Sequence, residues 1–211
     1  MKKILFLMLC SIPMLLNAQW GIKAGANFSN VSKAGDVSSD SKTGFTGGIF
    51  FEAPGTKTFG FRSEISYYKA GYGYSKAGSS DGDVNLDYLA LAQLATFNLI
   101  KLVQVHLSLN TNFLINATVD STSSSVGSSK DPMDFLNHFD YGLGLGAELH
   151  PAGGLLVGAR FNWSFAKLFK DVSGQQPTWV APDAKINVFS IYAGYKIGSF
   201  KKDKEPAPTG M

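Results

Sequence analysis

The sequence predicts an all-β fold, an eight-stranded antiparallel up-and-down transmembrane β-barrel whose polar lumen is filled by side chains. Three observations lead to this prediction. Most of the chain after residue 19 alternates apolar and polar residues with a period of two, which is typical of strands with one apolar face. The alternating stretches are about 9 to 13 residues long, enough for a tilted strand to cross a bilayer. The connections between them are alternately short and long, as in outer-membrane barrels.

The first eighteen residues are predicted to be a secretory signal peptide that is not part of the fold. Lys2 and Lys3 form a positive segment, residues 4–16 are mostly apolar, and Ala18 supplies a small residue at the expected cleavage site. The apolar segment is shorter than the roughly 20 residues of a transmembrane helix. Cys10 is the only cysteine and lies in this segment, so we expect no disulfide, zinc-cysteine site or cysteine nucleophile in the mature chain.

The eight strands are assigned in chain order from their apolar rows. Aromatic and branched residues occupy alternate positions in three early stretches, and Gln93 interrupts the apolar row of the fourth. The last four stretches alternate more regularly. The predicted strands are 20–29, 45–52, 59–68, 86–99, 103–113, 138–150, 155–165 and 189–197.

The connections predict how the barrel is oriented. Short turns are expected near 54–58, 99–102 and 150–154, and long polar loops at 30–43, 73–85, 116–137 and 167–187. Because the strand number is even, both termini share the rim with the short turns, which is the periplasmic rim in such barrels. We therefore expect a barrel over residues 19–200, followed by a disordered periplasmic tail, 201–211, that is charged and then rich in proline.

The polar face of the strands is rich in small residues, which suit a narrow eight-stranded lumen. It also carries four cations and four anions, and because unpaired charges inside a barrel would be costly, we predict an internal network of salt bridges. The residues of this predicted network are Lys23, Glu52, Arg62, Glu64, Asp140, Glu148, Arg160 and Lys196.

Three glycines at alternate positions, Gly142, Gly144 and Gly146, satisfy the dinucleotide-binding pattern together with Ala147. That pattern requires a tight turn into a helix, whereas this stretch keeps the strand period and continues into a turn. We interpret the glycines as close-packing lumen positions, over which Arg62 and Arg160 reach towards Asp140 and Glu148.

The opposite face carries the aromatic residues that we expect at the two membrane interfaces. These candidates for the aromatic girdles are Trp20, Tyr67, Tyr141, Trp163 and Tyr195. A soluble lipocalin-like barrel, with its apolar face inward, remains an alternative because alternation alone does not say which face is inside.

Six segments, GIKAGANFSNV, GFTGGIFFE, FGFRSEISYYKAGYG, FDYGLGLGAELH, GLLVGARFNWSF and FSIYAGYKIG, together resemble the PorT-like outer-membrane β-barrel proteins of Bacteroidetes. The resemblance implies an eight-stranded barrel similar in plan to OmpA and OmpX. It also implies a link to protein secretion, since the founding branch of the family is tied to secretion across the outer membrane. The chain departs from the family in YLALAQLATFNL, where a YLEIPLL-like run is common, and in continuing beyond the last strand.

These patterns predict a non-enzymatic outer-membrane protein with a structural or interaction role through its long loops. No catalytic, cofactor-binding or metal-binding residue is predicted, since His106, His138 and His150 are few and scattered. The net charge of +3 forms no basic stripe, which argues against nucleic acid. The expected partners are outer-membrane lipid, the outer-membrane assembly machinery and proteins that contact the four long loops, and the barrel is expected to be a monomer. A narrow channel or transporter for small solutes is the second hypothesis, and the soluble ligand-binding barrel is the third.

Overall fold

A computed structural model describes residues 19–32, 38–75, 82–121, 132–151, 153–170 and 183–197. The predicted signal peptide, 1–18, and the predicted tail, 201–211, lie outside the described residues, as do the middles of the four long loops. No helix in the described part of the chain has the length and apolarity needed to cross a membrane.

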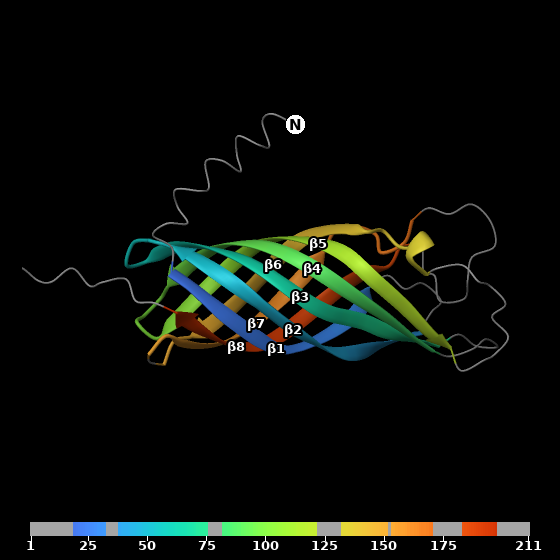
Figure 1. Cartoon of the computed structure of the whole chain (residues 1–211), viewed down its shortest axis with the longest axis horizontal. Coiled ribbons are helices and arrows are strands. Elements are labelled where there is room, and N and C mark those ends of the chain that lie inside the picture. Colours follow the sequence, from blue (N-terminus) through green and yellow to red (C-terminus); the bar gives the residue numbers. More distant parts are fainter. Residues whose placement is uncertain are drawn as a thin grey trace, which may run out of the picture.

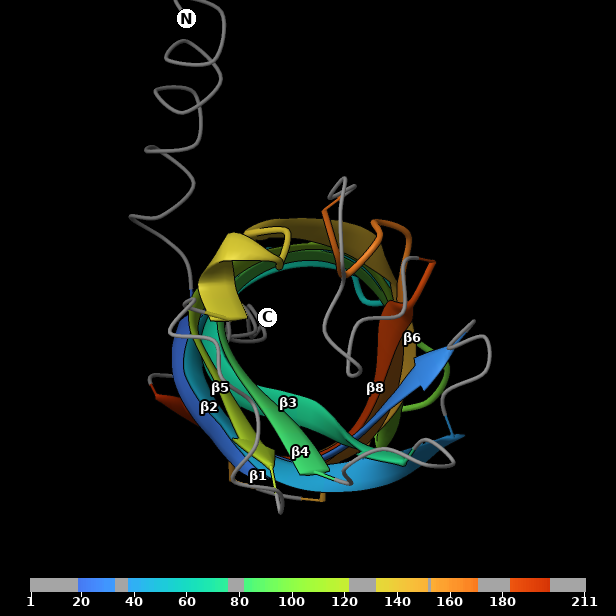
Figure 2. The same ribbon diagram turned by 90° about the vertical axis from the view of Figure 1, so that its right-hand side faces the viewer.

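Eight antiparallel strands close into one barrel in chain order (Figures 1 and 2). They are β1 (Gln19–Ser32), β2 (Ser38–Ala53), β3 (Phe59–Ser75), β4 (Gly82–Asn98), β5 (Val103–Ser121), β6 (Phe139–Leu149), β7 (Leu155–Ser164) and β8 (Lys185–Ile197). The pairing of β1 with β8, from Trp20↔Ile197 to Ser32↔Lys185, closes the ring. A short 3-10 helix, η1 (Pro132–Asp134), precedes β6. The predicted fold class is therefore confirmed.

The start of β1 and the end of β8 lie at the same rim of the barrel, because Trp20 is paired with Ile197. The short turns between β2 and β3, β4 and β5, and β6 and β7 belong to this end (Figure 1), which we call the terminal rim. The opposite end, the loop rim, carries the two long connections, between β5 and β6 and between β7 and β8, together with the short connections 33–37 and 76–81.

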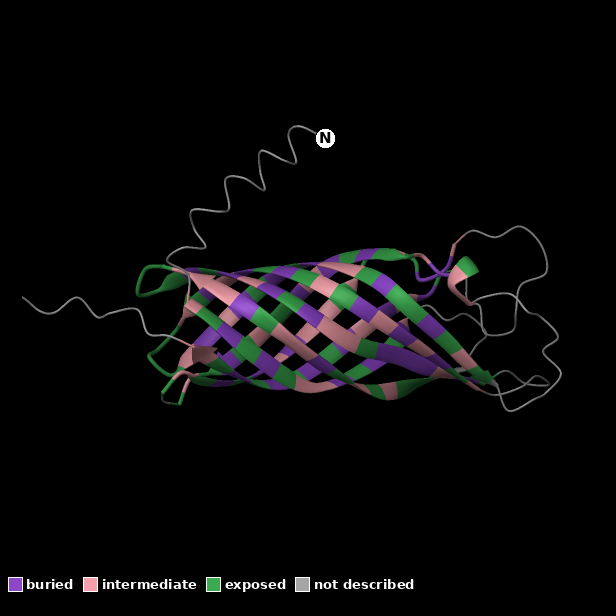
Figure 3. Ribbon diagram, viewed as in Figure 1, coloured by how far each residue is buried: buried purple, intermediate pink, exposed green. Residues whose placement is uncertain are grey.

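The two faces of the strands differ sharply in burial, so that buried and exposed residues alternate over the whole wall (Figure 3). Charged residues such as Glu64 and Glu148 are buried inside, whereas Leu109 and Leu145 are more than half exposed on the outside. This arrangement is the inverse of a soluble lipocalin-like barrel, which hides its apolar face. The soluble alternative is therefore wrong, because water would solvate the exterior apolar band poorly, whereas lipid matches it.

The strands are longer at the loop rim than the sequence indicated. The third strand was predicted to end at Tyr68, but β3 runs to Ser75, and β5 continues to Ser121 in register with the start of β4 at Gly82. Parts of all four predicted loops, 30–43, 73–85, 116–137 and 167–187, are thus strand. Beyond the bilayer band the pattern inverts, with apolar residues such as Leu86 inside and polar residues outside, so the outward apolar row ends before the strand does.

Candidate functional site

The interior is organised around two residues of β3, Arg62 and Glu64. They are two positions apart and therefore share the inward face of the strand, and both are almost completely buried, at 1% and 2% exposure. Each is the centre of a group of polar contacts that reach strands on other sides of the ring.

Arg62 contacts three acceptors from three strands. Its Nη1 donates to Glu148 Oε1 of β6 at 2.6 Å, and its Nη2 donates to Gln104 Oε1 of β5 at 3.0 Å and to Glu52 Oε2 of β2 at 3.4 Å. The guanidinium also lies 4.9 Å from the ring centroid of Phe50. Glu52 in turn accepts from Lys196 Nζ at 2.7 Å, so that this half of the network reaches β8.

Glu64 receives both terminal nitrogens of Arg160 from β7, at 2.7 and 3.0 Å, a bidentate pairing with well-defined geometry. Lys23 Nζ of β1 adds a contact of 2.5 Å to the same carboxylate. Arg160 Nε donates to His106 Nε2 at 2.9 Å. Since β3 and β7 are four strands apart in an eight-stranded ring, the Glu64–Arg160 pair spans the lumen.

Seven of the eight residues predicted for the salt-bridge network lie in these two groups, which are themselves joined by Arg62 Nη1 and Glu64 Oε1 at 3.8 Å. Sequence reasoning did not include Gln104, His106 and Tyr192, whose hydroxyl donates to Glu148 Oε1 at 2.9 Å. All three occupy inward positions of β5 and β8, so their place on the polar face was the available signal.

Asp140 is the exception. The expectation that the arginines cross towards it is wrong for Asp140, because Arg62 reaches Glu148 and Arg160 reaches Glu64. Asp140 accepts instead from Asn112 Nδ2 at 2.9 Å, and no salt bridge joins it to another of the described residues. A cavity of about 60 Å³ lies between Asp140 and the two cations Lys23 and Arg160, all of which line it. This volume is enough for a few water molecules.

The three predicted close-packing glycines line the interior beside this network. A Cβ at Gly146 would lie 2.4 Å from His106 Nε2, and one at Gly144 would lie 2.3 Å from Ser108 Oγ. At Gly142 the nearest atom would be the Trp163 carbonyl oxygen, at 2.0 Å. Side chains at Gly144 and Gly146 would therefore displace polar side chains in the lumen, and one at Gly142 would clash with the backbone of β7.

The half of the lumen near the loop rim is apolar, which corrects the prediction of a polar lumen for that half. Tyr72, Leu86, Tyr88 and Ile186 belong to one buried cluster there, and the rings of Tyr68 and Tyr88 stack with centroids 5.1 Å apart. These residues occupy inward positions, so the inverted alternation of residues 82–88 was the signal that could have revealed the cluster.

Two segments fold over this cluster and together form what we call the cap, residues 132–138 and 166–170. Leu136 forms a bridge with Phe169, and both side chains are buried, at 0% and 1% exposure. Asn137 Nδ2 donates to the carbonyl oxygens of Lys167 and Phe169, at 2.8 and 3.0 Å. Figure 2, a view onto the loop rim, shows η1 at the mouth of the ring.

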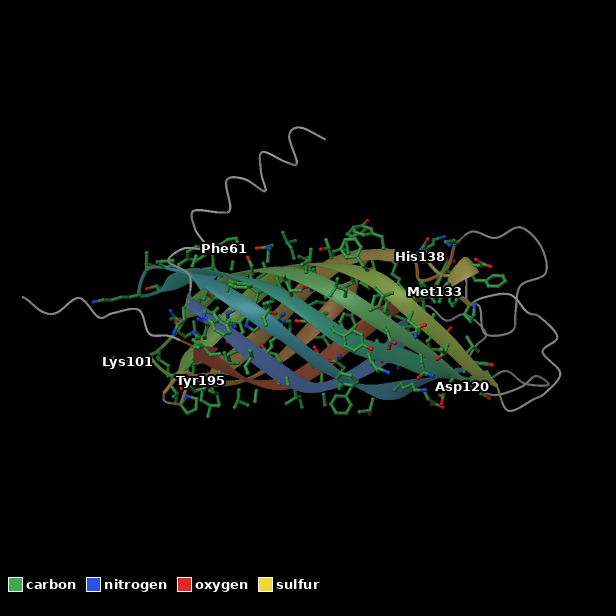
Figure 4. The ribbon with its side chains drawn as sticks, in the orientation of Figure 1. Phe61, Lys101, Asp120, Met133, His138 and Tyr195 are labelled. Carbon is green, nitrogen blue, oxygen red and sulfur yellow. The ribbon has the colours of Figure 1, made fainter. Side chains whose placement is uncertain are left out.

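The five girdle candidates project outward at two levels. Trp20 and Tyr195 lie near the terminal rim, where Figure 4 labels Tyr195, and are 46% and 50% exposed. Tyr141 and Trp163 are exposed nearer the loop rim, and Tyr67 is half-buried there. Two aromatic levels on one exterior are the arrangement that interfacial girdles require.

The histidines do not gather into one site. His106 is buried in the network, whereas His138 Nε2 lies 3.1 Å from the carbonyl oxygen of Met133 in the cap. His150 Nε2 lies 3.2 Å from Glu148 Oε2 at the terminal rim. In the described ranges no group of three or more His, Cys, Asp or Glu residues could hold a metal ion.

Comparison with known proteins identifies the class of the barrel. A family model described as outer membrane protein beta-barrel domain matches residues 12–170, which is most of the chain. Neisserial surface protein A has a similar structure, with a TM-score of 0.55 and 17% sequence identity. The matched region covers 84% of this chain and 97% of the Neisserial chain. Ail, the attachment invasion locus protein of Yersinia pestis, matches with a TM-score of 0.52 and 18% sequence identity. Its matched region covers 85% of this chain and 99% of the Ail chain. At such identities the two structures support the fold alone. No curated protein sequence matches the chain significantly.

Proposed function

The chain belongs to the outer membrane protein β-barrel family, and we propose that it is a closed, non-enzymatic barrel that acts through its loop rim. The observation that carries this proposal is the double obstruction of the lumen. Salt bridges join β3 to β6 and β7 near the terminal rim, and the apolar cluster under the cap fills the other half. A conducting path would have to break both.

With the lumen closed, the part of the barrel available for contacts with other molecules is the loop rim, which carries the long connections. β3, β4 and β5 extend towards it beyond the apolar exterior band, so they support the loops at a distance from the bilayer. In outer-membrane barrels this rim faces the extracellular side. We propose that proteins or surface polymers contact the barrel there, and that the barrel is a monomer in the membrane.

The finer assignment is to the PorT-like barrels of Bacteroidetes, with a role linked to protein secretion or surface assembly. The segments that support it are the six strand motifs given above. A deletion strain with a reduced set of proteins in the culture medium, restored by the wild-type gene, would support this role, and an unchanged set would contradict it.

Conductance is the test of the closed lumen. Purified protein is inserted into planar bilayers, and we expect no steady conductance for the wild type. A matched variant, Glu64→Ala combined with Arg160→Ala, removes the pair that spans the lumen but leaves the cap in place. Steady conductance of the wild type would contradict the proposal and favour the narrow channel.

Export is tested separately. We propose that the signal peptide, 1–18, is removed after Ala18 and that residues 201–211 lie on the periplasmic side. Intact-mass measurement of protein from the outer-membrane fraction should give a chain that begins at Gln19. A tag after Met211 should resist protease in whole cells and be cleaved after the outer membrane is opened.

A further inference from the structure

The outer surface of the barrel is hollowed near the loop rim, over β2 to β5. The hollow has a volume of about 580 Å³, and its polar lining includes Thr43, Lys69, Asn85, Asp87, Asn116 and Thr118. This volume lies within the range of small-ligand sites, about 300–1,000 Å³. The hollow is separate from the salt-bridge network and the cap.

The hollow exists because β2 and β3 lose their regular pairing there. Their register shifts between Ser41 and Thr46, and β1 supplies the missing hydrogen bonds to β3. Ser29 Oγ donates to the Gly71 carbonyl oxygen and accepts from the Gly71 amide, both at 2.8 Å. Gly44 allows β2 and β3 to approach closely at this irregularity, because a Cβ there would lie 2.2 Å from the Lys69 carbonyl oxygen.

Three polar side chains stand side by side on the surface of the hollow. Lys69, Asp87 and Asn116 are at one level on neighbouring strands, since Lys69 is paired with Asp87 and Asp87 with Asn116. Asn116 Nδ2 donates to Asp87 Oδ2 at 3.1 Å, and Lys69 Nζ lies 3.8 Å from Asp87 Oδ1. The site thus offers donors and acceptors within a short span, which suits a ligand rich in hydroxyl groups.

The lower edge of the hollow is aromatic. Phe45, 51% exposed, and Tyr67 have ring centroids 5.7 Å apart, and Lys69 Nζ lies 5.9 Å from the centre of the Phe45 ring. Below this pair the outward residues are apolar, as at Ile49 and Ile65. The aromatic pair therefore marks the outer edge of the lipid-facing band, at the level of the lipid headgroups, and the hollow lies on the outer side of that level.

We propose that this hollow binds a saccharide, with Asp87 and Asn116 bonded to sugar hydroxyls and the face of Phe45 against the ring. Its level just outside the headgroups favours the sugar chain that extends outward from an outer-leaflet glycolipid, and a free surface polysaccharide would present the same chemistry. A phosphate is disfavoured because a carboxylate faces each lysine: Lys42 Nζ lies 3.0 Å from Asp83 Oδ2, and Lys69 lies beside Asp87.

The test is calorimetric titration of the full barrel in detergent micelles with three probes. They are rough lipopolysaccharide, the oligosaccharide released from it by mild acid, and the lipid A that remains. We expect lipopolysaccharide and the oligosaccharide to bind, and lipid A, which lacks that oligosaccharide, to bind at least about tenfold more weakly. Binding of lipopolysaccharide alone would assign the site to a glycolipid, and equal binding of the oligosaccharide would assign it to the sugar. Equal affinity for lipid A, or the absence of binding of both lipopolysaccharide and the oligosaccharide, would overturn the proposal.

The variant Asp87→Asn separates a sugar from a phosphate. Loss of the carboxylate weakens bonds to hydroxyls, so a saccharide should bind about tenfold more weakly, whereas a phosphate would bind more tightly once the negative charge is removed. Asp134→Asn, an exposed carboxylate of η1 outside the hollow, is the matched control and should bind as the wild type does. Tighter binding by Asp87→Asn would overturn the proposal. The heat-dependent gel shift of each variant checks folding, and conductance of the lumen has no bearing on the result.

Discussion

Arg62 of β3 and Glu148 of β6 form a salt bridge of 2.6 Å inside the barrel, at 1% exposure each. The two residues are 86 positions apart in sequence, and their strands are three apart in the ring. Glu148 also accepts from Tyr192 of β8. The contact therefore ties together strands that no backbone pairing connects.

Arg62→Met should destabilise the barrel strongly, because it leaves Glu148 buried without its cation. The loss of one partner of a buried ion pair costs about 3–5 kcal/mol. Urea unfolding of the barrel in lipid vesicles measures the free energy of unfolding. The double variant Arg62→Met with Glu148→Met should recover part of this loss, and a double variant as unstable as the sum of both single variants would contradict the pairing.

Gly146→Ala should cost about 1–3 kcal/mol, the usual effect of an added methyl group in a packed interior. The new Cβ would lie 2.4 Å from His106 Nε2 and 2.5 Å from the Ala159 carbonyl oxygen, so His106 would be pushed from Arg160. Gly47→Ala is the control, since no atom lies within 4 Å of its added Cβ. Equal unfolding midpoints for the two variants would show that Gly146 is not a close-packing position.

Asn137→Ala should loosen the cap while the barrel stays folded. The side chain makes two hydrogen bonds to cap carbonyl groups, each worth about 0.5–1.5 kcal/mol. Hydrogen exchange should become faster in residues 132–138 and 166–170 and stay unchanged in β6. Lys101→Ala, an exposed turn residue at the terminal rim (Figure 4), should leave exchange in the cap as it is.

Leu145→Arg tests which face meets lipid. Leu145 is near the middle of β6 and 53% exposed, so an arginine there should cost about 2–4 kcal/mol in a bilayer, against about 0–1 kcal/mol near the interface. Leu99→Arg, at a turn of the terminal rim and 64% exposed, provides the comparison near the interface. A cost at Leu145 no larger than at Leu99 would place the membrane elsewhere on the barrel.

Much of the wall could be predicted from the sequence, because the side-chain period of a strand is a local property. The alternation in residues 139–149 identified Asp140, Glu148 and the glycines as one face without reference to any other strand. The same reasoning could not delimit the strands near the loop rim. Near the loop rim the outside of the barrel faces water, so the apolar residues of the strands point inward there. Val84 and Leu86 therefore belong to β4 although the outward residues beside them are polar.

The sequence by itself determined the barrel, the number of its strands and the residues that face inward near the terminal rim, since these follow from the period, the length and the spacing of the strands. Only the tertiary structure decided which inward residues meet. Glu64 could have been matched with several cations, and the closed ring placed Arg160 and Lys23 against it and left Asp140 with Asn112. The cap and the hollow beside Lys69 were decided in the same way. They depend on a bridge between Leu136 and Phe169 and on a register shift between β2 and β3, and such contacts between distant segments leave no period in the chain.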